Sequence, residues 1–413
     1  MLTNIINSSK KINPFGGIFF VINELKKKGL AKLIDTHLGQ RVKQAKYSYS
    51  DIILNWAYCN LCGAERLEDI EKLRDSLDMK LPSHDALGTV MKSFATETIL
   101  IKGGKKAKRP HEFNIHKPLN SLMLDMALNL NLLKKNKPYT LDYDNTIIEA
   151  KKYDVTKTFK WSYGYQPGVS FIDKIPVYIE GRNGNSNAEM LMCETLERGF
   201  ELLDKKGVKI DKFRSDAAAF QFNVIDLMEK RDINFYIRLV KNHKFSEKVE
   251  AGVKSWEKIT VKDTEIELGE GIYTSTRFKK EYRMIVTKYK NRKGNYDYRA
   301  IITNDFKMTP EEVLRFYNMR GAIERNFDDL KNNFNWHRLP FSFLNENTVF
   351  MIISAINSII YQYLIRKFSS KVDFVKRKHR LKNFIFHFIV CSAILVKGKL
   401  QMFTERNYRP LME

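Results

Sequence analysis

Residues 317–331 read YNMRGAIERNFDDLK and combine an apolar face with a narrow polar stripe. An α-helix turns about 100° per residue, so positions three, seven and fourteen residues after the first fall within a stripe about 60° wide. The polar side chains at these positions are Tyr317, Arg320, Glu324 and Lys331. The neighbouring apolar positions, which predict a buried face, are Met319, Ile323, Phe327, Leu330 and Phe334. This pattern suits either a surface helix with an Arg320–Glu324 ion pair or a functional site.

The sequence TPEE at 309–312 marks the start of this helix. Thr309 suits the N-cap position, Pro310 the first helical position and Glu312 the third, where the Thr and Glu side chains satisfy free backbone amides. We therefore predict one helix over 310–334.

The chain has 413 residues and a formal net charge of +23, from 71 Lys and Arg against 48 Asp and Glu. This length predicts two or three domains. Because the positive charge is spread along the chain rather than gathered in a tail, it predicts a polyanionic partner, with nucleic acid ahead of a membrane surface.

Four cysteines are too few for a disulfide scaffold in a chain of this length, and no signal peptide opens the sequence. Both features predict a reducing cytoplasm. Cys59 and Cys62 have a spacing found in zinc sites, but the sequence holds no second such pair. We expect both in the core, on a helix that ends at Gly63.

Two apolar stretches, 349–365 and 383–396, are short or interrupted by Asn and Gln, unlike a membrane span. We therefore expect buried helices and no membrane partner. The whole region 341–413 is predicted to be helical.

The first part of the chain, residues 1–100, shows helical periodicity with breaks at NPFGG, LCGAE and LPSH, which predicts a helical domain. The helix within 81–95 begins at Ser83 and resembles the second helix of a helix-turn-helix, so it is a candidate for reading DNA ends, although most such helices only support a fold. The segment 101–137 follows as a basic linker, with a loop at 101–113 that lies near phosphates or is simply solvated, and a connecting helix.

From residue 138 strands alternate with helices. We predict the first part of the core over 138–241, a β-rich insertion over 242–308 and a helix completing the core over 309–340. The expected strands lie within 138–148, 168–181, 210–216 and 233–241, and the expected helices within 185–207 and 217–232. This order predicts an α/β fold, a mixed sheet flanked by helices, with a site at the strand ends.

Acidic residues mark two of these strands. The strand period of two places Asp142 and Asp144 on one face, opposite Tyr143. Asp216 stands where the strand expected at 210–216 ends and the next helix begins, a position at which its ordinary role is an N-cap. With Glu324, these acids form a suitable set of oxygen ligands for Mg²⁺, and two such ions can promote phosphodiester cleavage. The spacing alone does not decide between Asp142 and Asp144.

The combined pattern resembles bacterial insertion-sequence transposases of the DDE type, in the group marked by Tyr, two residues, Arg, three residues, Glu, six residues and Lys. The residues that match without a gap are Tyr317, Arg320, Glu324 and Lys331. Asp-x-Thr at 144–146, Arg-x-Asp at 214–216 and the signature extend the likeness over about 140–335. One departure is RSDAAAF, which lacks the Gly commonly found after the second acid.

The resemblance implies a ribonuclease-H-like core in which the catalytic acids hold two Mg²⁺ ions, with Mn²⁺ as a substitute. It favours Asp144 over Asp142, because the first acid of the family precedes x-Thr. The implied catalytic and metal-binding residues are Asp144, Asp216 and Glu324.

The resemblance also implies that Tyr317, Arg320 and Lys331 hold DNA phosphates beside the metals. It further implies an aromatic residue of the insertion that stacks on a displaced base. Trp256 and Trp161 are candidates by location and residue type only, and burial in the core is the ordinary alternative for each.

The implied activity is cleavage and joining of DNA at the ends of an insertion sequence. The implied partners are double-stranded DNA with transposon-end inverted repeats and target DNA, bound by a homodimer in the bacterial cytoplasm at the nucleoid. A ribonuclease-H-like nuclease without strand transfer is one alternative. A non-catalytic DNA-binding protein derived from a transposase is another, and the three acids with the full signature argue against it.

Overall fold

Five helices form the first part of the chain in the computed structural model. They are α1 (Ile18–Lys27), α2 (Leu30–Leu38), α3 (Tyr49–Leu61), α4 (Asp69–Leu77) and α5 (His84–Ser93). The structure describes residues 12–77, 80–102, 109–240, 245–261, 264–274, 280–291, 294–396 and 399–412. The helices pack through apolar faces, and their buried side chains belong to the same hydrophobic core as those of the rest of the molecule.

The predicted core position of the two neighbouring cysteines is confirmed. Helix α3 ends at Leu61, Cys62 caps it, and Gly63 follows with a φ of 99°. Both cysteines are buried and free of disulfides. Burial raises the pKa of the Cys59 thiol to about 12, so the thiolate that zinc requires is disfavoured.

An 11-stranded mixed sheet forms the centre of the molecule, in the order β1-β2-β8-β7-β3-β9-β10-β14-β13-β12-β11. Its strands are β1 (Thr98–Ile101), β2 (His111–Asn114), β3 (Pro138–Asn145), β7 (Gly168–Ile172), β8 (Ile175–Arg182), β9 (Lys209–Ser215), β10 (Asn234–Arg238), β11 (Val253–Val261), β12 (Thr264–Thr274), β13 (Glu281–Lys290) and β14 (Tyr296–Thr303). Strands β3, β9 and β10 run parallel, whereas β7 and β8 are antiparallel to their neighbours. The predicted mixed sheet is therefore confirmed.

Strand β3 lies inside the sheet because β7 pairs with one of its edges and β9 with the other. Leu141 and Tyr143 are fully buried, as the strand period predicts. In the register, Asp142 lies opposite Arg214 of β9 and Asp144 opposite Val169 of β7. The acids of β3 thus lie next to two other strands.

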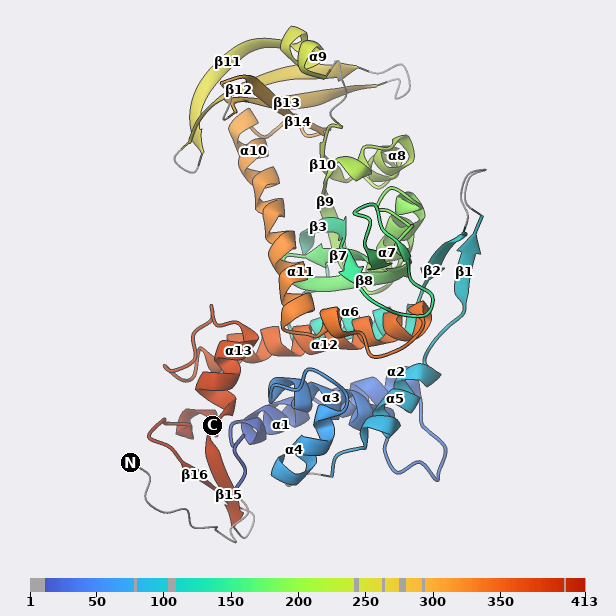
Figure 1. Ribbon diagram of the computed structural model, residues 1–413. Coiled ribbons are helices and arrows are strands. Elements are labelled where there is room, and N and C mark those ends of the chain that lie inside the picture. The colour runs from blue at the N-terminus through green and yellow to red at the C-terminus, as the bar shows by residue number, and fades with distance from the viewer. Residues whose placement is uncertain are drawn as a thin grey trace.

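Helices pack against this sheet, and two of them, α6 and α12, also contact the N-terminal helices (Figure 1). They are α6 (Lys117–Asn129), α7 (Met192–Lys205), α8 (Phe222–Lys230), α10 (Pro310–Asn318), α11 (Ala322–Asn332) and α12 (Leu344–Phe368). Helix α12 contacts β8 on one side and α3 and α5 on the other. It is long and apolar enough to cross a membrane by length and composition, yet 94% of its most apolar window is buried inside the protein. The prediction of a buried helix at 349–365 is confirmed.

The prediction of a second buried helix at 383–396 is wrong in its latter half. Helix α13 (Leu381–Phe384) continues as a single π-helical turn, and then β15 (Ser392–Val396) pairs with β16 (Lys399–Phe403). Backbone bridges join Asn13 to Ala393 and Phe15 to Cys391, so the hairpin finds its partner at the other end of the chain (Figure 1). That distant partner leaves no local trace in the sequence.

Three further expectations about local structure need correction. The basic loop expected at 101–113 is bounded by β1 and β2, which pair as a hairpin at one edge of the sheet, and residues 103–108 lie outside the described residues. The helix expected at 185–207 begins only at Met192. The helix expected at 217–232 is split, because Ala217–Ala219 form a 3-10 turn before α8.

The β-rich segment that was expected as an insertion continues the central sheet. Strand β14 pairs with β10, so β11 to β14 extend the same sheet, with α9 (Phe245–Gly252) beside them. These strands project at one end of the molecule (Figure 1). A separate three-stranded sheet, which the sequence did not predict, contains β4 (Ile148–Glu149), β5 (Thr156–Lys157) and β6 (Tyr163–Tyr165).

Candidate active site

Asp144 lies at the end of β3 and is held by Arg320. The guanidinium Nη2 donates a hydrogen bond to Asp144 Oδ2 at 2.8 Å, and both side chains are largely buried. Burial raises the pKa of the Asp144 carboxyl to about 6, the Arg320 charge opposes this shift, and the nearby carboxylate of Asp216 adds to it. The structure therefore brings Asp144, Asp216 and Arg320 together.

Arg320 also keeps one donor free. Its Nε is buried without a hydrogen-bond partner among the described residues. A buried donor without a partner costs free energy unless something supplies an acceptor. The guanidinium is therefore suited to a second oxygen beside Asp144, and phosphate is an oxygen acceptor that arginine binds well.

Asp142 has a different environment from Asp144. Its Oδ1 and Oδ2 accept hydrogen bonds from Nε and Nη2 of Arg214 at 2.8 and 2.7 Å, and both residues are buried. Arg214 Nη1 also donates to the backbone oxygen of Phe316 at 2.7 Å. Burial raises the pKa of Asp142, and the Arg214 guanidinium opposes the shift. This pair joins β3, β9 and α10, so both oxygens of Asp142 are occupied by a structural contact.

Asp216 follows β9 and caps the 3-10 turn after it, as its N-cap reading predicts. Its Oδ1 accepts a hydrogen bond from the Ala218 amide at 3.0 Å, so the cap uses only one of the two carboxylate oxygens. The hydroxyl of Tyr317 donates to the backbone oxygen of Ser215 at 3.3 Å. Tyr317 thus lies against the backbone that positions Asp216.

The helix of the polar stripe begins as predicted but is not continuous. Thr309 and Glu312 form the expected capping box. Helix α10 ends at Asn318, a 3-10 turn covers Met319–Gly321, and α11 begins at Ala322, so the prediction of a single helix over 310–334 is wrong. Glycine is a poor helix former, and Gly321 lies at this break.

The break changes one member of the predicted apolar face. Met319 is 57% exposed, contrary to the prediction, because it belongs to the 3-10 turn. The other members of the face are buried as expected: Ile323, Phe327, Leu330 and Phe334. Helix α11 therefore docks on the core as predicted, and only the turn departs from the pattern.

Lys331 and Glu324 lie further along α11. Lys331 is half-buried and lines a cavity of about 440 Å³ together with Asn145, Thr146 and Lys160. Burial lowers the pKa of Lys331, and the Lys160 charge lowers it further. Glu324 is exposed, in the helical turn that follows Arg320.

The three predicted metal ligands are not assembled as one cluster. Across the described residues, no group of three or more His, Cys, Asp or Glu side chains is placed to hold a metal ion. Asp144 and Asp216 are close enough to influence each other and fit part of a divalent-cation site, whereas Glu324 does not complete it in this arrangement. The chemistry of the donor set suits Mg²⁺, and its geometry here is incomplete.

The two candidate tryptophans differ in exposure. Trp256 of β11 is partly buried, its ring centroid lies 6.1 Å from that of Tyr298, and Lys288 Nζ lies 5.1 Å from its centroid. Trp161 is 77% exposed and lies in the turn between β5 and β6, outside the β-rich segment. Trp256 is therefore packed against its neighbours, whereas Trp161 is accessible to solvent.

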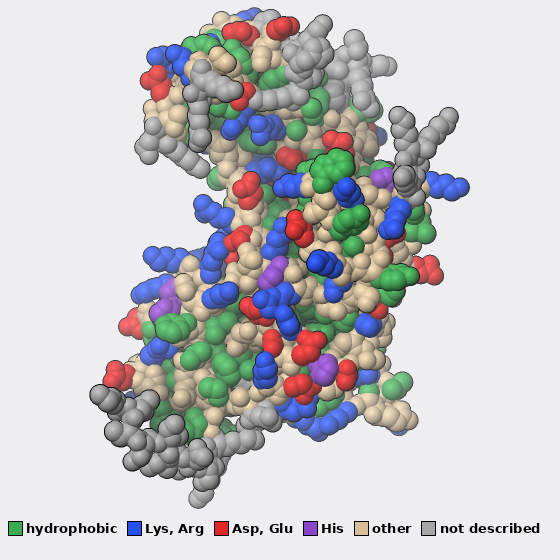
Figure 2. Space-filling view, viewed as in Figure 1, with side chains coloured by type: hydrophobic (Ala, Val, Ile, Leu, Met, Phe, Trp, Pro, Cys, Tyr) green, Lys and Arg blue, Asp and Glu red, His purple; other side chains and the backbone are tan. Residues whose placement is uncertain are grey.

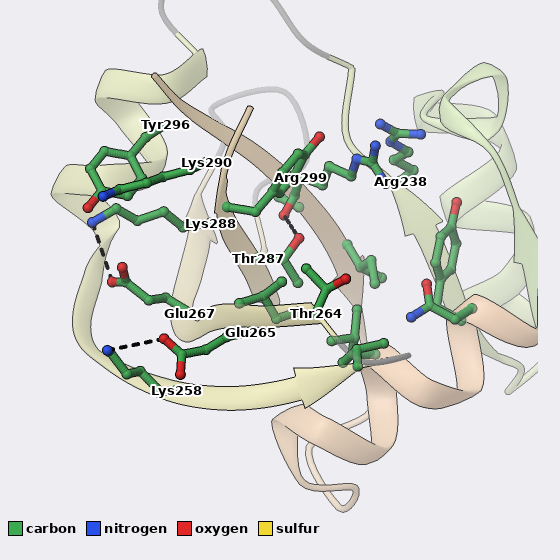
Figure 3. Close-up of a pocket in the computed structure, with 18 of the residues that line it drawn as sticks. Arg238, Lys258, Thr264, Glu265, Glu267, Thr287, Lys288, Lys290, Tyr296 and Arg299 are labelled. Carbon is green, nitrogen blue, oxygen red and sulfur yellow. Dashed lines mark hydrogen bonds and ion pairs between the residues drawn. The ribbon is translucent and has the colours of Figure 1, made fainter. Parts of the chain in front are cut away.

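A cleft of about 680 Å³ lies between strands β12 to β14 and the end of α10, and Tyr317 and Arg320 belong to its wall. In Figure 3, Lys258 pairs with Glu265 and Lys288 pairs with Glu267. Arg238 and Arg299 also line the cleft. Figure 2 shows Lys and Arg side chains around a notch on one face of the molecule, between the projecting strands and the remainder. The charged residues that line the cleft are therefore mainly basic, and Arg320 in its wall also contacts Asp144.

Arg238 is a residue that sequence reasoning missed. It ends β10, which is parallel to β9, and β9 is parallel to β3. Asp144, Asp216 and Arg238 thus lie at or just after the carboxyl ends of three adjacent parallel strands. The available signal was a polar residue directly after the apolar run of the strand expected at 233–241.

Comparisons with known proteins identify the family of the chain. The family described as Transposase DDE domain group 1 matches residues 8–401. No curated protein matches the chain. Among solved structures, a cryo-EM structure of the piggyBac transposase synaptic complex with hairpin DNA is similar at 12% identity and a TM-score of 0.41, over 90% of this chain and 78% of that chain. Because the family match spans most of its length, this chain belongs to the DDE transposase domain group 1 family.

Proposed function

We propose that the protein is a bacterial insertion-sequence transposase that cleaves and joins phosphodiester bonds at DNA ends. The observation that carries this proposal is the meeting of Asp144, Asp216 and Arg320 at the ends of two parallel strands. Membership of the DDE transposase family supports transposition as the activity. The net charge of +23 supports DNA as the partner.

The proposed catalytic core is ribonuclease-H-like. Three antiparallel strands, β8, β7 and β3, followed by the parallel strands β9 and β10, support this assignment. In such a core the first and second acids end neighbouring strands. Asp144 and Asp216 have these positions on β3 and after β9.

Glu324 is proposed as the third acid. It lies about one helical turn after Arg320 and about two turns before Lys331. Arg320 contacts Asp144, and Lys331 lines a cavity with the next residues of that strand, Asn145 and Thr146. Because both flanking members of the stripe lie against the end of β3, the proposal requires α11 to move so that Glu324 approaches the aspartates when DNA binds.

The basic and hydroxyl side chains around the acids are proposed to position the DNA. Arg320 has a buried donor beside Asp144 that no described residue accepts from, and Tyr317 supplies a hydroxyl next to Asp216. Lys331 supplies a cation in the cavity that it lines with Asn145 and Thr146. Divalent cations, Mg²⁺ or Mn²⁺ in its place, would supply Lewis-acid chemistry between the carboxylates when bound. Arg320 meanwhile keeps the Asp144 carboxylate oriented and compensates its buried charge.

The partners proposed for this activity are transposon-end inverted repeats and target DNA, bound by a homodimer in the cytoplasm. Helix α5 is the candidate for end recognition. It exposes Asp85, Thr89 and Lys92, and Lys92 lies 4.0 Å from Glu346. One acid and one compensated cation give α5 little attraction for phosphates, so any recognition by this helix has to come from contacts with bases.

The deciding experiment uses DNA that carries the repeats flanking the gene, incubated with the full chain and Mg²⁺. Mapped cuts at the repeat ends and joined products are expected. Asp144→Asn, Asp216→Asn and Glu324→Gln should each abolish cleavage while end binding persists, because the basic surface is unchanged.

The outcome also separates the alternatives. Cuts without joined products would identify a nuclease that lacks strand transfer. Binding without cuts, identical in the wild type and in Asp144→Asn, would identify a non-catalytic DNA-binding protein. Cleavage that survives in all three variants would refute the assigned acids.

A further inference from the structure

A short basic segment lies in the C-terminal region, between α12 and α13. Residues 376–382 read KRKHRLK and include no Asp or Glu, and we call this segment the basic turn. Its exposed cations are Lys376, Arg377, Lys378, Arg380 and Lys382. Runs of this kind are either solvated loops or contacts for nucleic acid. The packing and the surroundings of the basic turn distinguish the two.

The backbone of the basic turn is held in place. Val375 just before it is 1% exposed and Leu381 within it is 3% exposed, so both side chains are anchored in the core. The Tyr361 hydroxyl of α12 donates a hydrogen bond to the His379 backbone oxygen at 2.5 Å, and the His379 amide donates to the Lys376 oxygen at 2.9 Å. The cations therefore project from an ordered backbone, unlike those of a disordered basic tail.

Most of the positive charge of the basic turn is uncompensated. Arg380 Nη1 lies 2.8 Å from Asp328 Oδ2 of α11, whereas the other four cations form no ion pair within the described part of the chain. Burial lowers the pKa of His379, and the nearby charges of His387 and of two lysines of the turn lower it further. Like charges held close together repel each other unless a polyanion lies against them. The basic turn therefore has the electrostatic character of an anion-binding surface.

Arg380 connects the basic turn to the helix that follows Arg320. Its partner Asp328 lies eight residues after Arg320 in the sequence, which is about 12 Å along a helix. Arg320 in turn contacts Asp144. Successive phosphates of one DNA strand are about 3.4 Å apart along the duplex axis, so this distance corresponds to about three to four base pairs. A duplex that reaches the candidate active site is therefore long enough to reach the basic turn.

The basic turn also borders the notch on the surface of the molecule. Helices α10 and α11 run along the notch, with strands β11 to β14 at one end and α13, which follows the turn, at the other (Figure 1). Figure 2 shows Lys and Arg side chains at both ends of the notch. Arg238 and Arg299 line the cleft at the end formed by the strands. Basic surfaces therefore lie on both sides of the candidate active site.

We propose that the basic turn is a further DNA-binding surface, which holds phosphates of duplex DNA at the end of the notch opposite the cleft. This assignment rests on the proposed function in taking DNA as the partner, and it does not require cleavage. It adds a contact outside the Tyr-Arg-Glu-Lys stripe, about three to four base pairs from the bond that is cut.

The composition of the basic turn favours DNA over an anionic membrane. Stable membrane binding by a basic segment needs apolar side chains or a lipid anchor as well. The apolar residue of the turn, Leu381, is buried, so the turn exposes only polar and charged side chains. Lysines and arginines on a duplex backbone are the usual means of sequence-independent DNA binding.

The test compares duplex binding by the full chain with that of Lys376→Gln/Arg377→Gln/Lys378→Gln, in which glutamine removes three charges from exposed positions. Fluorescence anisotropy with labelled end DNA, without divalent metal, gives the association constant at several salt concentrations. The constant should fall at least about tenfold at about 100 mM salt, and its logarithmic salt slope should become shallower by about two to three. Random duplex should be affected equally, because phosphate contacts carry no sequence information.

A matched control removes the same charge at the other end of β3. Lys134→Gln/Lys135→Gln/Lys137→Gln changes three exposed lysines just before β3 begins, whereas Asp144 lies near its end. This control should bind duplex with the affinity and salt slope of the wild type. Lys376→Arg/Lys378→Arg should also bind normally, because it keeps the charge of the basic turn.

Ethylation interference locates the contact on the DNA. In the wild type, ethylation of phosphates about three to four base pairs from the cut site should weaken binding. This interference should disappear in the glutamine variant. If it persists there unchanged, another part of the protein holds those phosphates and the proposal is wrong.

Other results would also contradict the proposal. An unchanged salt slope in the folded glutamine variant would show that the basic turn contacts no phosphate. Loss of binding to phosphatidylserine vesicles, with unchanged duplex affinity, would identify a membrane surface instead. If the wild type cleaves its ends and the variant binds duplex normally, the basic turn fails and the transposase proposal stands. If the wild type never cleaves while the variant loses duplex affinity, the DNA surface stands without the transposase.

Discussion

Arg320 Nη2 lies 2.8 Å from Asp144 Oδ2 and thereby connects the break between α10 and α11 to the end of β3. The same guanidinium retains a buried Nε without a partner among the described residues. One arginine can thus hold a carboxylate and still offer a hydrogen bond to a phosphate oxygen.

Replacing Arg320 by Lys should slow cleavage of pre-bound end DNA at least tenfold. Lysine keeps the charge but loses the planar fork that can serve the carboxylate and the phosphate at once. Single-turnover cleavage in Mg²⁺ measures the effect, with Arg315→Lys as the control because Arg315 is exposed and paired with Glu311. A rate equal to that of the wild type would show that Arg320 has no role in positioning the phosphate.

The Tyr317 hydroxyl should contribute less than Arg320. Tyr317→Phe keeps the ring and removes one hydrogen bond to the Ser215 oxygen, a contact of roughly 0.5–1.5 kcal/mol. Its cleavage rate under the same conditions should fall by less than that of Arg320→Lys or Lys331→Ala. A larger loss in Tyr317→Phe would mean that the hydroxyl acts on the substrate directly.

Asp142→Ala should destabilise the protein by about 3–5 kcal/mol, because it leaves the buried Arg214 guanidinium without its carboxylate. Urea unfolding measures this, and Glu311→Ala, which breaks an exposed ion pair, should cost less than about 1 kcal/mol. Because the family resemblance favours Asp144 over Asp142 as the metal ligand, the expectation from sequence is that Asp142→Ala retains activity. The structure restricts that expectation to temperatures at which the variant stays folded.

DNA affinity should fall steeply with salt. Each phosphate that a lysine or arginine neutralises releases counterions, and six to ten such contacts lower the association constant by about three to five decades between about 50 and about 200 mM salt. Titrations of end DNA and random duplex at several salt concentrations give the slope. A flat response would remove nucleic acid as the main partner of the basic surface.

Recognition of the DNA ends by α5 is testable without removing any part of the fold. Helix α12 packs against α3 and α5, so deleting residues 1–100 would expose its apolar face. Thr89→Glu instead adds a charge at an exposed position of α5. If α5 reads bases, preference for end DNA over random duplex should fall while single-strand binding is unchanged. Equal preference in both proteins would assign α5 a structural role.

The sequence predicted those parts of the fold that have a strong local period. The strands that became β3, β9 and β10 have apolar runs bounded by polar residues, and the register of the sheet then brings their ends together. Asp144 and Asp216 could be found for the same reason. The capping box at Thr309 was also visible, because its two partners are three residues apart.

The remaining features depend on contacts between distant residues. The break at Gly321 coincides with the Arg320 contact to Asp144, which no local pattern encodes. The position of Glu324 relative to the aspartates likewise depends on how α11 docks. The exposure of Trp161 follows from a turn with positive φ, a conformation that its residue type disfavours.

Backbone bridges join Asn13 to Ala393 and Phe15 to Cys391, so these contacts can form only late in the synthesis of the described chain. A ribosome adds about 5–20 residues per second. Residues 391–393 are therefore synthesised on the order of tens of seconds after residues 13–15, with which they pair. The hairpin of β15 and β16 can therefore close on the first residues of the fold only after residue 393 has been synthesised. A nascent chain that stops before this point lacks the closure, so the native arrangement of residues 13–15 depends on a segment made more than 370 residues later.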